Sequence, residues 1–217
     1  IALSLPPDVL WNLYKNLGMG KRSSLGIAGE QSGYLGNGQS WERNAFEHAT
    51  KSFGYGISVN TAQLTQMFAV FANDGVLQPL KIIKNSPKPT DEQPQRIFSK
   101  SVNQTMVHLL ERVIADNPNT KAKVANYRVA GKSGTARKVE NGRYSNSKHR
   151  SFYAGFGPVS NPRYVVVVMI DEPSKGQYYG GAVAGPVFSA IMGDTLRILN
   201  IKPDGLTELP KLQLISN

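Results

Sequence analysis

Four stretches of the chain carry apolar residues three and four positions apart, which is the spacing along one face of an α-helix. The first stretch begins at Pro6-Pro7-Asp8, where proline suits the first turn of a helix, and ends at Gly18. The other three cover about residues 61–73, 101–115 and 183–199. Their apolar side chains are predicted to face a core and are, in chain order, Leu64, Met67, Phe68 and Phe71; Val102, Met106, Leu109, Leu110, Val113 and Ile114; and Val187, Ile191, Leu196 and Leu199.

Three later stretches predict β-strands, at residues 128–138, 151–157 and 164–171. In each of them apolar residues alternate with others or form a short continuous run. The connections between them are short, so the strands are expected to form an antiparallel meander. Helices packed on an antiparallel sheet define an α+β fold.

The rest of the chain is predicted to connect these elements. Residues 18–40, rich in glycine and serine, predict a long surface loop, and residues 79–83 predict a short strand. Residues 85–95 contain three prolines and predict a connecting loop. We expect residues 1–202 to belong to one domain and residues 203–217 to form a loosely ordered C-terminal tail.

Composition narrows the class of protein. Of the 217 residues 40% are hydrophobic, which permits a real core, and no run approaches the roughly 18 apolar residues of a membrane span. The lack of cysteine excludes disulfides, thiol catalysis and cysteine-type zinc sites. With three histidines and no clustered acids, the sequence predicts neither a metal site nor a cofactor. His48 and His108 are predicted to lie on a loop and on a helix surface.

The formal net charge of +10 raises nucleic acid or an anionic surface as partners. The basic residues are dispersed, however, and no nucleic-acid motif accompanies them, so we expect no nucleic-acid partner. The densest cluster falls within one predicted hairpin and comprises Arg137, Lys138, Arg143, Lys148 and Arg150. This cluster is interpreted as a solvated basic surface, with a modest attraction to anionic wall polymer or lipid headgroups.

The most informative chemistry lies in Lys132, Ser133, Gly134 and Thr135, on the first predicted strand. Along a strand Ser133 and Thr135 share one face, and Gly134 points to the other. Two hydroxyls beside a lysine suit a carboxylate, which accepts hydrogen bonds and prefers a charged donor. Gly134 lets another backbone or a ligand come close. An ordinary basic edge strand with a glycine bulge remains the alternative for these four residues.

Lys-Ser-Gly-Thr is the third of three motifs in penicillin-recognising serine enzymes. Further segments in the same order are Phe-Gly-Tyr-Gly-Ile (53–57), Asn-Gly-Arg-Tyr (141–144), Ala-Gly-Phe-Gly-Pro (154–158), Asn-Pro-Arg (161–163), Ile-Asp-Glu-Pro (170–173) and Tyr-Tyr-Gly-Gly-Ala-Val-Ala-Gly-Pro-Val-Phe (178–188). On these residues the chain resembles the C-terminal part of the septum-specific class B penicillin-binding proteins. These are the D,D-transpeptidases that cross-link cell-wall peptides at the division site of Gram-negative bacteria, with a fold like that of serine β-lactamases.

The resemblance implies roles for the motif. The backbone N–H of Thr135 would form half of an oxyanion hole, and the hydroxyls of Ser133 and Thr135, with Lys132, would hold the terminal carboxylate of D-Ala or of a β-lactam. Lys132 would either relay a proton or act only through its charge; the sequence leaves both open.

Other residues carry weaker implications. Arg137 shares the face of Thr135 and is expected to be a second carboxylate partner or a strand partner. Tyr55 resembles a pocket aromatic, with turn packing as the alternative. Tyr178 and Tyr179 resemble an aromatic wall beside the substrate, with exposed loop aromatics as the alternative. His149 falls where the family can place a ring that lines the site.

Two motifs of the family, Ser-x-x-Lys with the nucleophile and Ser-x-Asn, come before the region that this chain matches. The resemblance therefore implies a fragment, inactive alone, of a protein anchored at the periplasmic face of the inner membrane by an N-terminal segment absent from this chain. Literal matches are interpreted as a polar turn and as helix caps; they are Ser145-Asn146-Ser147-Lys148, Ser58-Val59-Asn60 and Ser101-Val102-Asn103.

Two functions compete. The first is a transpeptidase fragment whose partners would be peptidoglycan stem peptides, β-lactams and divisome membrane proteins. The second is a noncatalytic penicillin-binding-like module that binds or senses muropeptides. A serine β-lactamase or a D,D-carboxypeptidase is a third possibility, disfavoured by the division-type segments around Tyr178.

Overall fold

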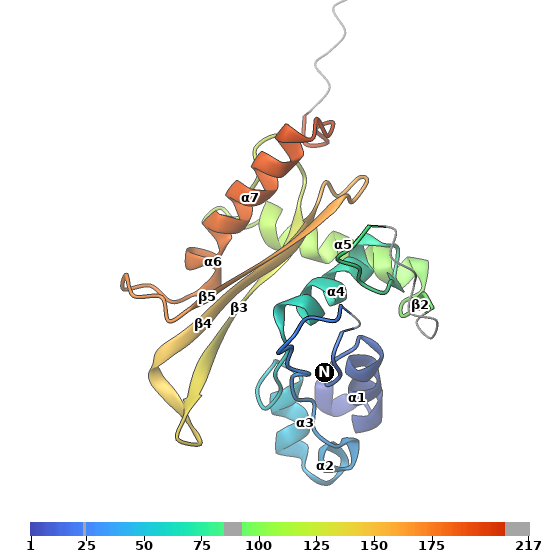
Figure 1. Ribbon diagram of the computed structural model, residues 1–217, viewed down its shortest axis with the longest axis vertical. Coiled ribbons are helices and arrows are strands. Elements are labelled where there is room, and N and C mark those ends of the chain that lie inside the picture. The colour runs from blue at the N-terminus through green and yellow to red at the C-terminus, as the bar shows by residue number, and fades with distance from the viewer. Residues whose placement is uncertain (24, 85–92, 207–217) are drawn as a thin grey trace, which may run out of the picture.

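The structure, a computed structural model, describes residues 1–23, 25–84 and 93–206. Its centre is an antiparallel sheet of three strands with helices on both sides (Figure 1). The strands are β3 (Ala130–Glu140), β4 (Arg143–Gly157) and β5 (Tyr164–Asp171), side by side in that order. The predicted α+β fold and the antiparallel meander are confirmed.

The second strand is longer than the sequence predicted. Residues 145–148 were interpreted as a polar turn, yet they lie within β4. Residues 143–144 and 149–150 on either side of them pair with β3 in the same ladder as residues 151–156, with an irregularity in between. Charged side chains stabilise this part of the hairpin: Lys148 binds Glu140 at 2.5 Å, and Lys138 binds Asp171 at 2.9 Å. Ion pairs between strands produce no apolar alternation, so the periodicity did not reveal them.

One face of the sheet is covered by α6 (Gly180–Val183) and α7 (Gly185–Ile198) (Figure 1). The sequence predicted one helix over residues 183–199, but the chain breaks at Ala184 and resumes with a proline in the first turn of α7. Of the four residues predicted to cover the sheet, Leu196 is fully buried as expected, whereas Val187, Ile191 and Leu199 are exposed. Phe188 and Met192, which were not predicted, are fully buried instead. Two adjacent stripes of α7 are apolar, and the sequence alone did not tell which one meets the sheet.

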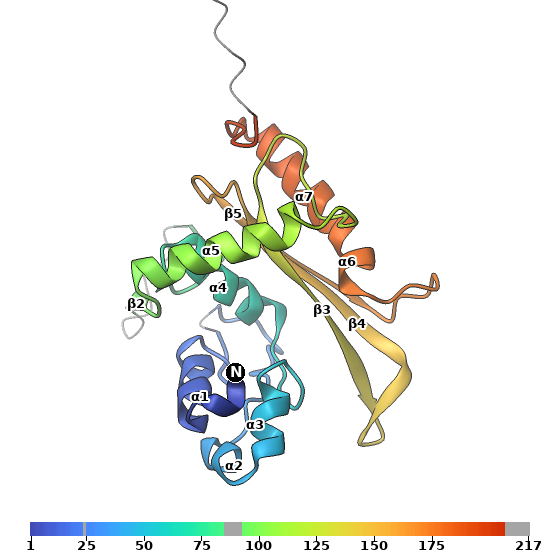
Figure 2. The ribbon, with the colours of Figure 1, turned by 180° about the vertical axis from the view of Figure 1, so that it is seen from behind.

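The other side of the sheet faces α4 (Thr61–Ala72) and α5 (Lys100–Ala115), and α5 contacts β3 while crossing the direction of the strands (Figure 2). Both helices were predicted to within two residues. Asn60 caps α4 in a capping box with Gln63, and Ser99 caps α5. Three α5 residues that were predicted to face the core are instead exposed in this chain, namely Val102, Leu109 and Val113.

A lobe of short helices completes the chain, with α1 (Pro7–Asn16) as predicted. Two helices in it were missed, α2 (Gly38–Arg43) and α3 (Ala45–Lys51), because six or seven residues are too few to show a helical period. They bury Trp41 completely and, contrary to the predicted loop position, place His48 within α3. The chain begins with a 3₁₀ turn, Ala2–Ser4.

The strand predicted at residues 79–83 was wrong. The pairing occurs earlier, where β1 (Val76–Leu77) meets β2 (Gln95–Arg96). Of the connecting loop predicted over residues 85–95, residues 85–92 lie outside the described part of the chain. Across the described residues, no helix combines the length and the apolar character needed to cross a bilayer.

The end of the described chain is hydrogen-bonded to segments that flank the sheet. The Asp204 carboxylate accepts hydrogen bonds from the backbone N–H groups of Arg128 at 2.8 Å and Ser160 at 3.0 Å. The backbone of Gly205 donates to the Asn126 carbonyl at 3.0 Å. The boundary between residues 202 and 203 stays a prediction, and residues 207–217 of the predicted tail lie outside the described residues.

The observed face of α7 yields a stability prediction. Phe188 is fully buried and its ring centroid lies 4.8 Å from that of Tyr153, so Phe188→Ala should lower the free energy of unfolding by about 3–5 kcal/mol. Val187→Ala, on the exposed side of the same helix, should cost less than about 1 kcal/mol. Urea denaturation of the two variants measures both; equal losses would contradict this orientation of α7.

Candidate functional site

The Lys-Ser-Gly-Thr motif lies on β3, which in the described part of the chain pairs only with β4 and so forms an edge of the sheet. Ser133 and Thr135 are half-buried, whereas Lys132 and Gly134 are exposed. The two pairs of side chains belong to opposite faces of the strand. A ligand that lies along the free edge can therefore be reached from both faces.

Gly134 is open to a ligand. A Cβ atom added there would meet only the Cβ of Phe152, at an ordinary 3.8 Å, so the fold itself does not require glycine at this position. Gly131 differs, because its Cβ would lie 2.7 Å from the carbonyl oxygen of Ala154. This open space is compatible with the prediction that another backbone or a ligand can come close at Gly134.

The polar groups of the motif differ in their hydrogen bonds. The Oγ1 atom of Thr135 accepts a hydrogen bond of 2.9 Å from the backbone N–H of Gly180, which leaves its own proton free to donate. The hydroxyl of Ser133 has no hydrogen-bond partner among the described residues. The ammonium of Lys132 donates to the carbonyl of Ser133 at 2.9 Å. Both hydroxyls can thus donate to an added acceptor.

The segment 178–181 lies directly over the sheet beside the motif. A Cβ on Gly180 would lie 2.3 Å from the carbonyl oxygens of both Gly134 and Phe152, so the backbones touch here and only glycine fits. The hydroxyl of Ser151, which is fully buried, donates to the carbonyl of Tyr178. The sequence did not single out Ser151, because one serine in a strand carries no motif; its signal is its register opposite Thr135.

His149, Tyr178 and Tyr179 come together at this segment. The rings of His149 and Tyr178 stack with centroids 4.0 Å apart and an interplanar angle of 13°. His149 is buried, so its ring supports Tyr178 rather than forming an open wall itself. The hydroxyls of Tyr178 and Tyr179 are 3.4 Å apart; this contact raises the pKa of Tyr178, against a smaller opposing effect of Arg137.

Arg137 belongs to the same neighbourhood. It pairs across the ladder with His149, and one guanidinium nitrogen donates to the side-chain oxygen of Asn146 at 3.3 Å. Among the described residues Arg137 has no acidic partner. The structure therefore places a second cation along β3 beyond Thr135, beside the two tyrosines.

Tyr55 lies at the far end of the hairpin instead. Its ring meets that of Tyr144 at 5.0 Å and 78°, and that of Phe53 at 5.8 Å. The backbone N–H of Gly56 donates to the Tyr144 hydroxyl at 3.3 Å. These contacts join the helical lobe to the tip of the β3–β4 hairpin, and they do not include residues 132–135.

The literal Ser-x-x-Lys and Ser-x-Asn matches hold structural positions. Ser145 to Lys148 lie within β4, not at a helix start, and Asn60 is the cap of α4. Ser101 is not a cap, because Ser99 caps α5. One serine and one lysine side chain do meet among the described residues: Lys51 donates to Ser40 at 3.5 Å. That lysine also forms an ion pair with Glu47 at 2.6 Å, a much shorter contact than the one with Ser40.

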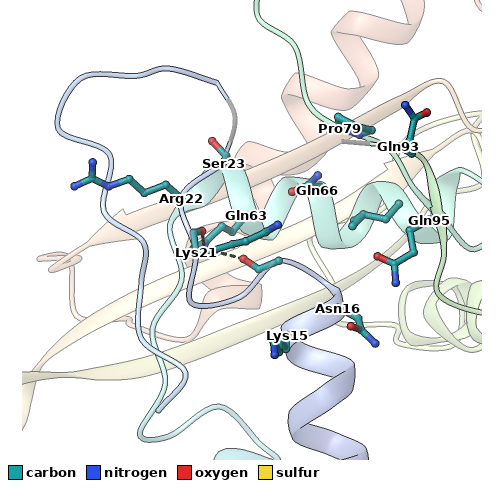
Figure 3. A pocket seen from close by; sticks show the side chains of 12 residues that line it. Lys15, Asn16, Lys21, Arg22, Ser23, Gln63, Gln66, Pro79, Gln93 and Gln95 are labelled. Atoms are coloured by element: carbon teal, nitrogen blue, oxygen red, sulfur yellow. Dashed lines mark hydrogen bonds between the residues drawn. The ribbon is translucent and has the colours of Figure 1, made fainter. Parts of the chain in front are cut away.

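A separate cavity of about 310 Å³ lies between α1, the loop after it and α4 (Figure 3). Polar side chains line much of it, among them Lys15, Lys21, Gln63 and Gln66. It includes none of the residues that the sequence placed in the site. Within the described chain no three His, Asp or Glu residues are grouped so that they could hold a metal ion.

Comparison with known proteins identifies the family. The family model described as the penicillin-binding protein transpeptidase domain matches residues 1–193. The chain belongs to this family. The resemblance that the motifs indicated is thereby confirmed.

The chain is also similar in sequence to individual members of the transpeptidase family. The chain is 42% identical to the peptidoglycan D,D-transpeptidase FtsI of Escherichia coli over 219 residues, covering 100% of this chain and 36% of that protein. It is 42% identical to the probable peptidoglycan D,D-transpeptidase PenA of Neisseria gonorrhoeae, covering 90% of this chain and 33% of PenA. The chain thus spans about a third of the length of these curated relatives.

A solved structure in the transpeptidase family also matches. It is the apo transpeptidase domain of penicillin-binding protein 3 from Burkholderia pseudomallei, with 40% sequence identity and a TM-score of 0.83. The match covers 94% of this chain and 61% of that one. The solved domain therefore contains further chain that has no counterpart here.

The contact beneath Gly180 yields a second prediction. Gly180→Ala should displace the segment 178–181, because its new Cβ would overlap two backbone oxygens at 2.3 Å. Gly181→Ala is the matched control: its nearest neighbours would be Ser133 atoms at 3.8 Å, and alanine favours a helix. We expect a clearly lower melting temperature for Gly180→Ala alone. Equal melting temperatures of the two variants would refute the backbone contact.

Proposed function

We propose that this chain is the motif-bearing part of a peptidoglycan D,D-transpeptidase. In the whole protein a serine would attack the D-Ala–D-Ala peptide carbonyl, D-Ala would leave, and an amine from a second stem peptide would resolve the acyl-enzyme. The observation that carries the proposal is the edge strand that presents Lys132, Ser133 and Thr135 together beside an aromatic segment. Membership of the transpeptidase family and the printed names of the relatives support it.

Each group of the motif has a role in this proposal. Alternate backbone N–H groups of an edge strand face away from the sheet, and we assign that of Thr135 to half of an oxyanion hole. The free proton of Thr135 and the hydroxyl of Ser133 would donate to the terminal carboxylate of D-Ala or of a β-lactam, with Lys132 supplying charge. One oxyanion donor typically contributes about 3–4 kcal/mol to transition-state stabilisation.

The remaining assigned residues would contact the body of the ligand. Arg137 would serve as a second cation for the carboxylate, Tyr178 and Tyr179 as an aromatic wall with His149 behind it, and Tyr55 as an aromatic group at the hairpin end. The exposed rings of Tyr178 and Tyr179 and their closeness to Thr135 through Gly180 support this arrangement.

The similarity to FtsI supports a role in cell division. The protein would then act at the periplasmic face of the inner membrane, anchored by a segment outside this chain, with divisome membrane proteins as partners and β-lactams as inhibitors. A noncatalytic module that binds muropeptides is the alternative. The two differ in one observation: the enzyme carries Ser-x-x-Lys and then Ser-x-Asn in the full-length protein, and the sensor has lost them.

The chain made alone should not be labelled covalently by a fluorescent penicillin. Among its described serines only the Ser40 side chain is hydrogen-bonded to a lysine side chain, at a long 3.5 Å, and that lysine, Lys51, forms an ion pair with Glu47 at 2.6 Å. Full-length protein should be labelled under the same conditions. Mass-spectrometric mapping of a stable adduct to any serine of this chain would contradict the prediction.

Removal of one hydroxyl tests the carboxylate site in the full-length protein. Ser133→Ala should raise the activation free energy of acylation by a penicillin by about 1.5–3 kcal/mol, the range for a hydrogen bond to a charged group. The melting temperature should stay unchanged, because this hydroxyl has no hydrogen-bond partner in the described chain. Thr135→Val should slow acylation by a similar amount and also lower the melting temperature, because the N–H of Gly180 loses its acceptor.

In Thr135→Val the backbone N–H survives, so the oxyanion hole remains and the loss should be partial. Lys132→Ala should be more severe, since it removes the local positive charge. Thr135→Ser keeps the hydroxyl and is the control. The measurement is the second-order acylation rate beside thermal melting. Wild-type rates in both Ser133→Ala and Thr135→Val would show that these hydroxyls do not hold the carboxylate.

A further inference from the structure

The segment 178–180 is hydrogen-bonded to two directly opposed positions of the sheet. Thr135 on β3 and Ser151 on β4 are partners in the ladder, so their side chains stand next to each other on one face. Thr135 accepts a hydrogen bond from the backbone N–H of Gly180, and Ser151 donates one to the backbone carbonyl of Tyr178. One strand pair therefore holds both ends of a three-residue segment.

These two hydrogen bonds, together with close packing, restrict the position of the segment. Ser151 has no exposed surface, so no water competes for its hydroxyl, and the contact of Gly180 with two carbonyl oxygens prevents a closer or a shifted seating. The ring of Tyr178 is fixed further by its stack on His149. The outward side of the segment carries Tyr178 and Tyr179, whose exposed fractions are 38% and 63%.

This arrangement couples the two parts of the site. The hydroxyl that would donate to a ligand carboxylate, that of Thr135, is the same one that accepts from the tyrosine segment. A ligand that binds there places the remainder of its body beside Tyr178 and Tyr179. The distance between the carboxylate contact and the aromatic contact is then set by the segment, and Ser151 is the side chain that fixes its Tyr178 end.

We propose that Ser151 is a positioning residue that sets the Tyr178–Tyr179 rings and thereby selects acylating ligands by the bulk of their acyl side chain. It acts through the carbonyl of Tyr178 and does not touch the ligand. The proposal rests on the proposed function, since it names what determines specificity at that same site. A bulky side chain gains contact area with the rings when they are held in place, whereas a small one does not reach them.

The test uses the full-length protein and two β-lactams with one nucleus, one with a small and one with a bulky acyl side chain. In Ser151→Ala, acylation by the small compound should stay within about threefold of wild type, and acylation by the bulky compound should fall at least tenfold. Hydrogen exchange of the Gly180 amide should accelerate at least tenfold. Ser189→Ala is the matched control, because Ser189 donates to the Lys123 carbonyl at 2.5 Å, away from the segment; both rates should be unchanged.

An unchanged ratio of the two acylation rates in Ser151→Ala, or an equal loss for both compounds, would overturn the proposal, because either result leaves Ser151 with a structural role only. If Ser151→Ala does not fold, Ser151→Cys, which keeps the side-chain shape with a weaker donor, is judged by the same ratio. If wild type is acylated by neither compound, the proposed function fails. The positioning by Ser151 is then judged on Gly180 exchange alone, and unchanged exchange would refute it.

Discussion

The pairing of β3 with β4 is the constraint on which the site depends. The register places Thr135 opposite Ser151 and Arg137 opposite His149, so these four side chains share one face. Because side chains alternate along a strand, a slip of β3 by one residue would turn Thr135 and Arg137 to the other face, away from Ser151 and His149 on β4. The apolar residues that fix this register lie at the buried end of β4, where Tyr153 packs against Phe188 of α7. The core under α7 thus determines which side chains β3 and β4 bring together at the candidate site.

A second constraint follows from the absence of a side chain. At Gly155 a Cβ would lie 2.6 Å from the Ala130 carbonyl and 2.8 Å from Phe188, and at Gly180 it would strike the backbone of both strands. The first glycine lets α7 approach the sheet, and the second lets the tyrosine segment rest on it. Gly134 has no such neighbour within the chain. Two glycines are therefore explained by the fold, whereas the described residues around Gly134 do not require a glycine there.

Sequence reasoning predicted β5, α1, α4 and α5 closely, because each shows a long periodic pattern or a clear start signal. It missed α2 and α3, whose seven or fewer residues carry no measurable period, and it shortened β4, whose outer half is held by ion pairs. The site residues followed from a motif, which names the residues but not their contacts. The burial of His149 behind Tyr178, the bond of Thr135 to Gly180 and the place of Ser151 all depend on long-range pairing, which no local pattern encodes.

The cations on and near the edge strand β3 differ in whether they form ion pairs. Three cations of the hairpin, Lys138, Lys148 and Arg150, form ion pairs. Lys138 lies within 2.9 Å of Asp171, and its contacts with Glu172 and Asp171 raise its pKa. Lys132 and Arg137 differ, because within the described residues neither forms an ion pair. A net charge of +10 spread over the chain would attract anions everywhere, but paired cations lose most of that effect at short range. These two cations flank Ser133 and Thr135 along β3, and the hydroxyl protons of both residues are free to donate to an added acceptor.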